Sequence, residues 1–373
     1  MFSDKKGSYI KILWGISIFI LQIIVIQIIA FFPDKVTVYY TQGIYYYISD
    51  FQQIIFGFVG FCLGDLIYAV LIVLFVIAII YLVKNRLRNR KSILYKFIVF
   101  INLFYALFNL FWGLNYYKQP FLEQFNIQKQ QSTNQDLFEL TEFVIQKTNQ
   151  LREKTHEDKE GIFKNKASFD KTIEKVIISY HDLCKKLNIK SHKTNPLFIS
   201  WYSEWISYLG IGGYYNPFFG TAQINGTILP HDYGMTISHE IAHQYGFASE
   251  KEANYIAFLN NLNSQDSDLQ YSAYYNTLWY LLYEVYKIDF ERFEQYKALL
   301  SVKVQNDRKA DRKYYEKYHG NISHTFSKAN NLYLKANKQE GIETYSYYVQ
   351  LVLNQFLSEK KETAGYYFLN DKI

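Results

Sequence analysis

Three long apolar runs in the first third of the chain limit its possible folds more than any other feature. They cover residues 12–32, 66–83 and 97–114, and none contains a charged residue. A helix rises 1.5 Å per residue, so about 18–20 residues suffice to cross the hydrocarbon layer of a bilayer. The first run is too long for a signal peptide, and no small-residue cleavage site follows Phe32. The sequence therefore predicts three transmembrane helices, with the lipid bilayer as a partner.

Basic residues gather beside these runs on one side only. The N-terminal lead contains Lys5, Lys6 and Lys11, and the link at 84–96 contains six basic residues and no acidic one. The positive-inside bias makes both segments cytoplasmic. Three crossings then place the chain after about residue 115 on the extracytoplasmic side, which is the periplasmic side of the inner membrane in a cell with two membranes. The +6 formal charge therefore reflects membrane topology, and no basic stripe suggests nucleic-acid binding.

The remaining pattern predicts a membrane domain at 1–117 and a globular domain at 118–373. The globular part is mainly α with a small β-sheet, an α+β class. Amphipathic stretches at 134–153 and 168–187 predict scaffold helices. Residues 221–228 predict a short strand, and helices resume from about residue 269.

Several polar residues and both cysteines allow further predictions about the membrane part of the chain. Residues 51–63 predict a helix lying at the membrane interface. Asn102 and Asn109 favour hydrogen bonds between transmembrane helices over a functional role. Cys62 and Cys184 are not expected to pair in a disulfide, because one lies at the membrane and the other in the globular part.

The stretch SHEIAHQYGFASEKEAN at 238–254 carries the clearest chemistry. On a helix, His239 and His243 lie on one face, so both imidazoles can bind one metal ion. Glu240 is turned away from that face, but it can reach a water on the ion. This HExxH spacing is typical of a zinc site that hydrolyses peptide bonds. The competing interpretation is a helix that contains two ordinary core histidines.

A catalytic zinc needs a third protein ligand and one open position. Gly246 can adopt the positive φ that ends the first helix, and Ser249 can cap a second one. If the two helices are antiparallel, Glu250 lies near His243 and Asn254 near His239. Glu250 is then the expected third ligand and Asn254 orients an imidazole.

Glu252 is the alternative third ligand. It stands at the position where a capping box needs a glutamate to reach back to Ser249, and that structural role would explain it without metal.

The same motifs resemble two groups of known proteins. HExxH followed by a helix with Glu250, Ala253 and Asn254 resembles the gluzincin zinc metallopeptidases, with Asn in place of the commoner Asp. The resemblance implies that Glu250 ligates zinc and that Asn254 supports a ligand histidine. Ser249 stands where the metzincin pattern needs a third histidine, so that pattern fails.

The whole layout resembles an uncharacterised family of bacterial membrane proteins, a domain of unknown function that is treated as zincin-like. The shared features are the three spans, the HExxH stretch and the segments FWGLNYYKQP, GGYYNPF and YLKANKQEGIETYSYYVQL. This resemblance implies a membrane-anchored metallopeptidase with no particular substrate.

The expected activity is that of a zinc hydrolase with a peptide or protein substrate. Zn²⁺ held by His239, His243 and Glu250 would lower the pKa of a bound water to about 7, and Glu240 would take the proton as general base. The predicted strand at 221–228 offers an edge for an extended substrate. The alternative is a zinc-binding or sensory membrane protein without catalysis. The donor that stabilises the transition state stays open; the candidates are His231, His319, His324 and Tyr345.

Overall fold

The computed structural model describes residues 2–84, 90–191, 193–194, 196–336 and 345–361. Internal contacts divide the chain into two compact units. The first, here called the membrane unit, contains residues 1–119 and 216–221. The second, the globular unit, contains residues 120–215 and 222–373. Each unit is described by itself.

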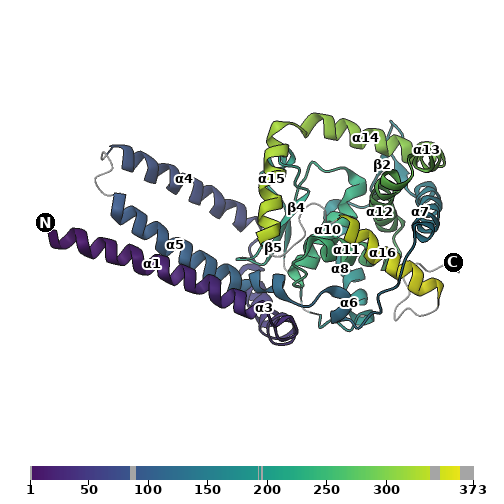
Figure 1. The fold of residues 1–373 in the computed structure, drawn as a ribbon. Coiled ribbons are helices and arrows are strands. Elements are labelled where there is room, and N and C mark those ends of the chain that lie inside the picture. Colours follow the sequence, from purple (N-terminus) through teal and green to yellow (C-terminus); the bar gives the residue numbers. More distant parts are fainter. Residues whose placement is uncertain (1, 85–89, 192, 195, 337–344, 362–373) are drawn as a thin grey trace. The chain divides into compact units, whose positions relative to one another are not determined.

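Three helices of the membrane unit are long and apolar enough to cross a bilayer (Figure 1). They are α1 (Phe2–Ile29), α4 (Leu63–Lys84) and α5 (Arg90–Phe111). The three predicted spans are confirmed as helices of sufficient length and apolar character, with boundaries that differ from the predicted ones. Helix α5 begins at Arg90, so Arg90, Lys91 and Lys96 belong to a helix and not to a loop. Residues 85–89 of the predicted basic link lie outside the described residues.

Helices α1 and α5 pack closely and share amide hydrogen bonds. Gln22 Nε2 donates to Asn102 Oδ1 at 2.8 Å, and Asn102 Nδ2 donates to the Gly15 carbonyl at 3.1 Å. A Cβ at Gly15 would lie 2.6 Å from Ile98 Cγ2, so only glycine allows this approach. The predicted inter-helix role of Asn102 is confirmed. Asn109 differs, since its amide donates to Tyr105 in its own helix.

The segment between α1 and α4 is more helical than its sequence predicts. It contains α2 (Pro33–Lys35), a π-helix η1 (Val36–Ile44) and α3 (Tyr45–Phe56). The interface helix expected at 51–63 was therefore placed too far along the chain, since α3 ends at Phe56. After α5, the short 3₁₀-helix η2 (Gly113–Tyr117) is joined to η1 by a hydrogen bond from Thr41 Oγ1 to Asn115 Oδ1 at 2.9 Å.

The globular unit is mainly helical with two small sheets, which confirms the predicted class at this level. Its first elements are α6 (Phe121–Gln124), α7 (Asn134–Lys154), β1 (His156–Glu157), β2 (Phe163–Lys164), α8 (Phe169–Lys186), β3 (Leu197–Ile199) and α9 (Ser203–Ser207). Strands β4 (Gly213–Asn216) and β5 (Thr221–Ile224) and the 3₁₀-helix η3 (Pro230–Asp232) follow. The remaining helices are α10 (Tyr233–Gln244), α11 (Glu250–Asn263), α12 (Ser267–Ile288), α13 (Phe290–Ala298), α14 (Val302–Tyr318), α15 (Asn321–Ala336) and α16 (Tyr345–Lys360).

Both predicted scaffold helices form, and side chains cap them. Thr133 and Asp136 make a reciprocal capping box at the start of α7. The Ser168 hydroxyl accepts from the Lys171 amide at the start of α8. These bonds satisfy backbone N–H groups that lack a partner in the first helical turn. Cys62 and Cys184 are buried, and neither forms a disulfide in the described part of the chain, as expected.

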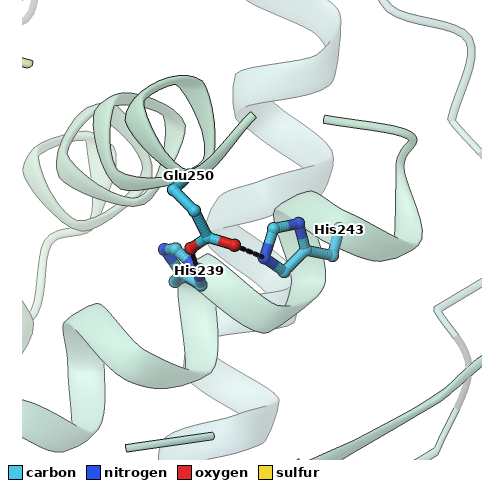
Figure 2. Close-up of side chains that lie close together, drawn as sticks. All are labelled: His239, His243 and Glu250. Atoms are coloured by element: carbon cyan, nitrogen blue, oxygen red, sulfur yellow. Dashed lines mark ion pairs between the residues drawn. The ribbon is translucent and has the colours of Figure 1, made fainter. Parts of the chain in front are cut away.

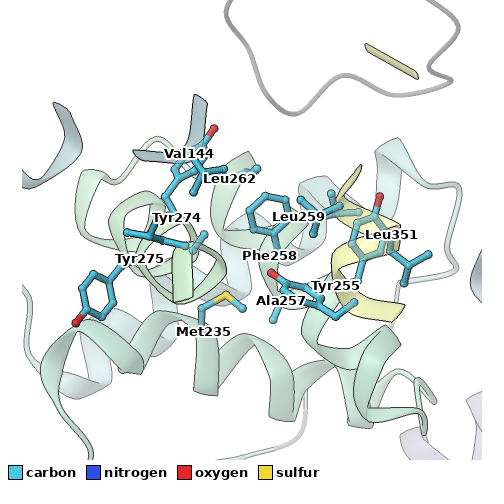
Figure 3. Packing of buried hydrophobic residues seen from close by; sticks show 14 of the residues in the cluster. Val144, Met235, Tyr255, Ala257, Phe258, Leu259, Leu262, Tyr274, Tyr275 and Leu351 are labelled. Atoms are coloured by element: carbon cyan, nitrogen blue, oxygen red, sulfur yellow. The ribbon is translucent and has the colours of Figure 1, made fainter. Parts of the chain in front are cut away.

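Helix α11 is the centre of the core. Its side chains from Lys251 to Leu262 are buried except at Asn254. Figure 3 shows Phe258 and Leu259 of α11 among residues of other helices, including Met235 of α10, Val144 of α7 and Leu351 of α16. Burial on all sides holds α11 firmly, because interiors of this kind are close-packed. The first residue of this helix is Glu250.

The larger sheet has the strand order β3-β5-β4. Strand β3 pairs with β5 in parallel, from Leu197 opposite Ala222 to Ile199 opposite Ile224. The strand predicted at 221–228 is thus confirmed as β5, but it ends at Ile224. Its position is central and its residues are buried, so the expectation that a substrate pairs with this strand is wrong. Strand β4 is the terminal strand on that side of the sheet.

Candidate metal centre

Helices α10 and α11 form a tight helical hairpin. Gly246 has φ +80°, a backbone conformation that favours glycine. The Gly246 amide donates to the His243 carbonyl at 3.0 Å, and the Phe247 amide donates to the Ala242 carbonyl at 3.1 Å. These two bonds are the Schellman arrangement that ends many helices. The predicted glycine turn is therefore confirmed, and it reverses the chain within a few residues.

Buried amides fix the register of the hairpin. Asn261 Nδ2 donates to the Gly234 carbonyl at 3.1 Å and to Ser238 Oγ at 3.0 Å, and Asn260 Nδ2 also donates to Ser238 Oγ. The end of α11 thus lies beside the start of α10, as an antiparallel pair requires. Glu250, the first residue of α11, therefore lies beside the end of α10.

Three side chains converge at that end of the hairpin. Glu250 Oε2 lies 3.1 Å from His239 Nε2, and Glu250 Oε1 lies 3.7 Å from His243 Nε2. Figure 2 shows the carboxylate reaching from α11 between the two imidazoles of α10. One ligand atom from each residue lies within 4.8 Å of the other two. The Glu250 side chain is 39% exposed, against 15% for His239 and 7% for His243, so solvent reaches the cluster on the Glu250 side.

The other nitrogen of each imidazole has an oxygen partner. His239 Nδ1 lies 2.8 Å from Asn254 Oδ1, and His243 Nδ1 lies 2.7 Å from the Phe247 carbonyl. Acceptors at Nδ1 favour the tautomer that carries its proton there and leaves the Nε2 lone pair free. Both Nε2 atoms therefore face Glu250, where a metal ion would take the place of any proton that they carry. Asn254 occupies the position next to His239 that the helix-face argument gave it.

Glu252 lies outside this cluster. Its Oε1 accepts from the Phe121 backbone amide at 2.7 Å, and the residue is 5% exposed. Ser249 is the N-cap of α11, but its side chain makes no capping hydrogen bond in the described structure. The predicted capping box with Glu252 is therefore not formed. Glu252 instead holds the start of the globular unit against α11.

Glu240 is a buried carboxylate with an unused oxygen. The residue is 3% exposed, and its Oε2 has no hydrogen-bond partner among the described residues. Its other oxygen faces Gly213 of β4, where a Cβ would lie only 2.8 Å away. Buried polar groups are normally hydrogen-bonded. An unpaired carboxylate on the residue after His239 therefore points to a functional role.

Burial and neighbouring charges shift the pKa values of the cluster in opposite directions. Burial opposes the charge on His239, but the hydrogen bond and charge of Glu250 prevail and raise its pKa to about 9. Burial also opposes the charge on Glu250, but the hydrogen bond from His239 and the charges of His239 and His243 prevail and lower its pKa to about 2. Burial and the charge of His239 lower the pKa of His243 to about 4. Burial raises the pKa of Glu240 to about 8. The charges thus favour an ionised Glu250 facing a positive partner.

Comparison with known proteins places the chain in a family. A family model described as "Protein of unknown function (DUF3810)" matches residues 40–353. The chain belongs to the DUF3810 family. The matched residues include the second and third spans and the whole of the α10–α11 hairpin. No curated protein and no solved structure matches the chain.

In this DUF3810 chain, the other candidate donors are not members of the cluster, as far as the structure describes them. His231 is fully buried, and its Nε2 lies 2.7 Å from Asp311 Oδ1. His319 stacks on Tyr315 with ring centroids 3.7 Å apart. His324 is exposed on α15. Tyr345 begins α16, but its side chain lies outside the described residues.

Two residues near the cluster had no predicted role. The ring of Tyr215 in β4 lies 6.5 Å from the ring of His243, and Gly213 contacts Glu240. Both belong to the GGYYNPF segment. The aromatic and glycine-rich composition of that segment was the only sequence signal for them.

Proposed function

We propose that this protein is a membrane-anchored zinc metallopeptidase, a hydrolase in which Glu240 is the general base. One observation carries the proposal. Two imidazole Nε2 atoms and the Glu250 carboxylate converge, and the neighbouring Glu240 keeps a buried oxygen without a partner among the residues that the structure describes. A purely structural helix would not gather these groups, because an unpaired buried carboxylate is costly.

The three residues fit the donor set of a zinc ion. Two neutral nitrogens and one carboxylate oxygen are the ligands of a common type of catalytic zinc site. Tetrahedral coordination with bonds of 2.0–2.2 Å would separate neighbouring ligand atoms by about 3.3 Å. The separations of 3.1 and 3.7 Å from Glu250 to the two imidazoles lie on either side of that value. His239, His243 and Glu250 would therefore hold the ion after small adjustments.

Each residue around the ion would have its own role in the reaction. Zn²⁺, when bound, acidifies a water molecule and polarises a carbonyl group. Glu240 accepts a proton from the attacking water at Oε2 and passes it to the departing amine of the cleaved peptide bond. A nearby positive charge lowers the raised pKa of Glu240, which brings it into the range of a general base at neutral pH. Asn254 and the Phe247 carbonyl keep both imidazoles in one tautomer and orientation.

Strand β4 is the best support for a peptide substrate. It is the terminal strand of its sheet, and Gly213 in it contacts Glu240. An extended peptide that pairs with this strand would pass its backbone in front of the general base. Tyr215, in the same strand, approaches His243 and is a candidate donor to the oxygen of the reacting carbonyl.

The proposed location is extracytoplasmic. The basic N-terminal lead and the basic residues around the start of α5 favour a cytoplasmic N-terminus. Three crossings would then put the globular unit outside. Reporter fusions at the end of α1 and within the globular unit, each active only outside the cytoplasm, would test this topology. Activity in neither fusion would contradict it.

The decisive experiment uses the full-length protein in detergent. We expect one zinc per chain by elemental analysis and hydrolysis of a peptide mixture that stops on chelation and returns with zinc. Glu240→Gln is expected to keep the zinc and lose the hydrolysis. A protein that binds zinc without any hydrolysis would instead support a sensory or structural zinc domain. A protein without metal after zinc loading would refute both functions.

A further inference from the structure

A second feature of the globular unit lies beside the proposed catalytic helix. It is a cavity of about 600 Å³ between α12, α14 and the chain that leads into β4. Aromatic residues, among them Tyr275, Trp279 and Tyr314, line much of it. Arg308 and Arg312, one turn apart on α14, also line it. Aromatic and charged side chains that converge on one cavity make it a candidate ligand site.

The cavity lies near the start of α10 and near the start of β4. Asp232, which precedes α10, and Gly212, which precedes β4, both line it. A Cβ at Gly212 would lie 3.7 Å from the Thr236 side chain, one helical turn before Glu240. The next residue, Gly213, contacts Glu240 itself. The cavity is therefore separated from the proposed general base by about one residue of β4.

The chain from Gly210 to Gly213 allows the length of a bound peptide to be estimated. A Cβ at Gly210 would lie 3.9 Å from His319, which lines the cavity just after α14. Three residues of chain, from Gly210 to Gly213, thus link the α14 side to Glu240. Three residues span at most about 10 Å. A peptide with its cleaved bond at Glu240 would reach His319, at the end of α14, with about three residues beyond that bond.

Most charges around the cavity already have partners. Arg308 donates to Asp311 at 3.2 Å and lies 4.1 Å from the centre of the Trp279 ring. Asp311 also accepts from Tyr275 and pairs with His231. Asp232 accepts from Asn276 at 3.2 Å.

Arg312 differs from these groups. It is exposed and has no charged or hydrogen-bonded partner among the residues that the structure describes. Its guanidinium is therefore available to a ligand. The exposed Glu316, one turn further along α14, also lines the cavity without such a partner in the described chain. Glu316 is the local competitor for Arg312.

We propose that this cavity is a substrate subsite that binds a carboxylate through Arg312, while its aromatic wall receives the adjoining side chain. A guanidinium binds carboxylates through two parallel hydrogen bonds. The carboxylate belongs to the C-terminus of a short peptide that extends from Glu240 into the cavity. The inference deepens the proposed peptidase function and rests on it for the identity of the ligand as a peptide.

The test measures binding and not turnover. Full-length Glu240→Gln protein in detergent is titrated with N-acetyl-Ala-Ala-Ala-Phe as the free acid and as the amide, with zinc and after chelation. A third probe, the amide of N-acetyl-Ala-Ala-Ala-Glu, carries its only carboxylate on a side chain. We expect the free acid to bind about tenfold more tightly than either amide, which is about 1.4 kcal/mol. Arg312→Gln should reduce this ratio to about one.

Glu316→Gln is the matched control, because it removes the opposite charge from the same helix face. We expect it to leave the preference for the acid unchanged or to increase it. Both positions are exposed, so thermal midpoints should match that of the parent protein. Equal binding of acid and amide, absence of binding, or weakening by Glu316→Gln in place of Arg312→Gln would each refute the subsite. If the probe with the glutamate side chain binds most tightly, the subsite binds an acidic side chain, and the proposal that it binds a C-terminus is refuted.

These outcomes separate the two proposals. Acid-selective binding without any hydrolysis by the wild-type protein would keep the subsite and remove the peptidase. Hydrolysis without a preference for the acid would keep the peptidase and remove the subsite.

Discussion

Replacing Glu240 by glutamine tests the proposed chemistry most directly. The substitution keeps the shape of the side chain, which is 3% exposed, and removes only its ability to take a proton. Loss of a positioned general base typically costs about 10²–10⁴-fold in rate. We therefore expect turnover of a peptide mixture to fall by at least about 100-fold, with one zinc still bound per chain.

The same variant has a predicted effect on stability in zinc-free protein. The pKa of Glu240 rises from 4.5 to about 8 on folding. Between these values the folded state holds a proton that the unfolded state releases, so stability falls as pH rises through this window. The full shift corresponds to roughly 4–5 kcal/mol, an upper bound for a carboxylate coupled to its neighbours. Glutamine does not titrate, so zinc-free Glu240→Gln should be the more stable protein at pH 8 and lose this advantage near pH 5.

The assay compares wild type, Glu240→Gln and the exposed control Glu291→Gln of α13 in detergent. Peptide hydrolysis and zinc content are measured with zinc, and thermal midpoints are measured across pH after chelation. Wild-type turnover by Glu240→Gln would refute the role of general base. Equal pH profiles of stability for wild type and Glu240→Gln would refute the argument from burial. Glu291→Gln should match wild type in every measurement.

Five further substitutions address the surrounding structure. Glu250→Gln should weaken zinc binding by more than about 100-fold, the largest loss typical of residues that only orient a ligand. Glu252→Gln should keep the zinc and lower only the thermal midpoint. The reverse result in metal titrations would exchange the roles of the two glutamates. Asn254→Ala should weaken zinc binding about 10–100-fold, and unchanged affinity would show that His239 needs no such support. Gly213→Ala adds a Cβ 2.8 Å from Glu240; it should lower turnover about 100-fold by displacing the carboxylate without loss of zinc, and full activity would contradict this contact. Asp307→Asn breaks a fully buried pair with Arg152 and should cost about 3–5 kcal/mol of stability in denaturant unfolding; a change below about 1 kcal/mol would refute that estimate.

Local sequence patterns were sufficient for the α10–α11 hairpin. Histidine spacing, a glycine with positive φ and an antiparallel return of the chain together predict that Glu250 and Asn254 face the two histidines. All of these residues lie within 16 consecutive positions, 239–254. Helical periodicity alone fixes which of them share a face, so no long-range information is needed.

Long-range contacts were not predictable in this way. The partner of Glu252 is Phe121, which lies 131 positions earlier, and no periodicity connects them. The contact between Gly213 and Glu240 depends on how a sheet meets a helix. The position of β5 at the centre of its sheet follows from its pairing with β3, which the apolar pattern of one strand does not reveal. The helical segment at 33–56 includes a π-helix. Its hydrogen bonds join residues five apart instead of four, so the α-helical pattern does not predict it.

The compact hairpin also affects when an ion could be captured. Closing a chain loop costs entropy that grows with its length, and His239, His243 and Glu250 lie within 12 consecutive residues. A partly folded chain could therefore gather all three donors at little entropic cost. If such a chain bound the ion, the ion would stabilise the folded unit less than an ion that joins remote segments. Metal loading could thus precede the docking of α16 during biosynthesis, and chelation of the mature protein would leave its helices assembled.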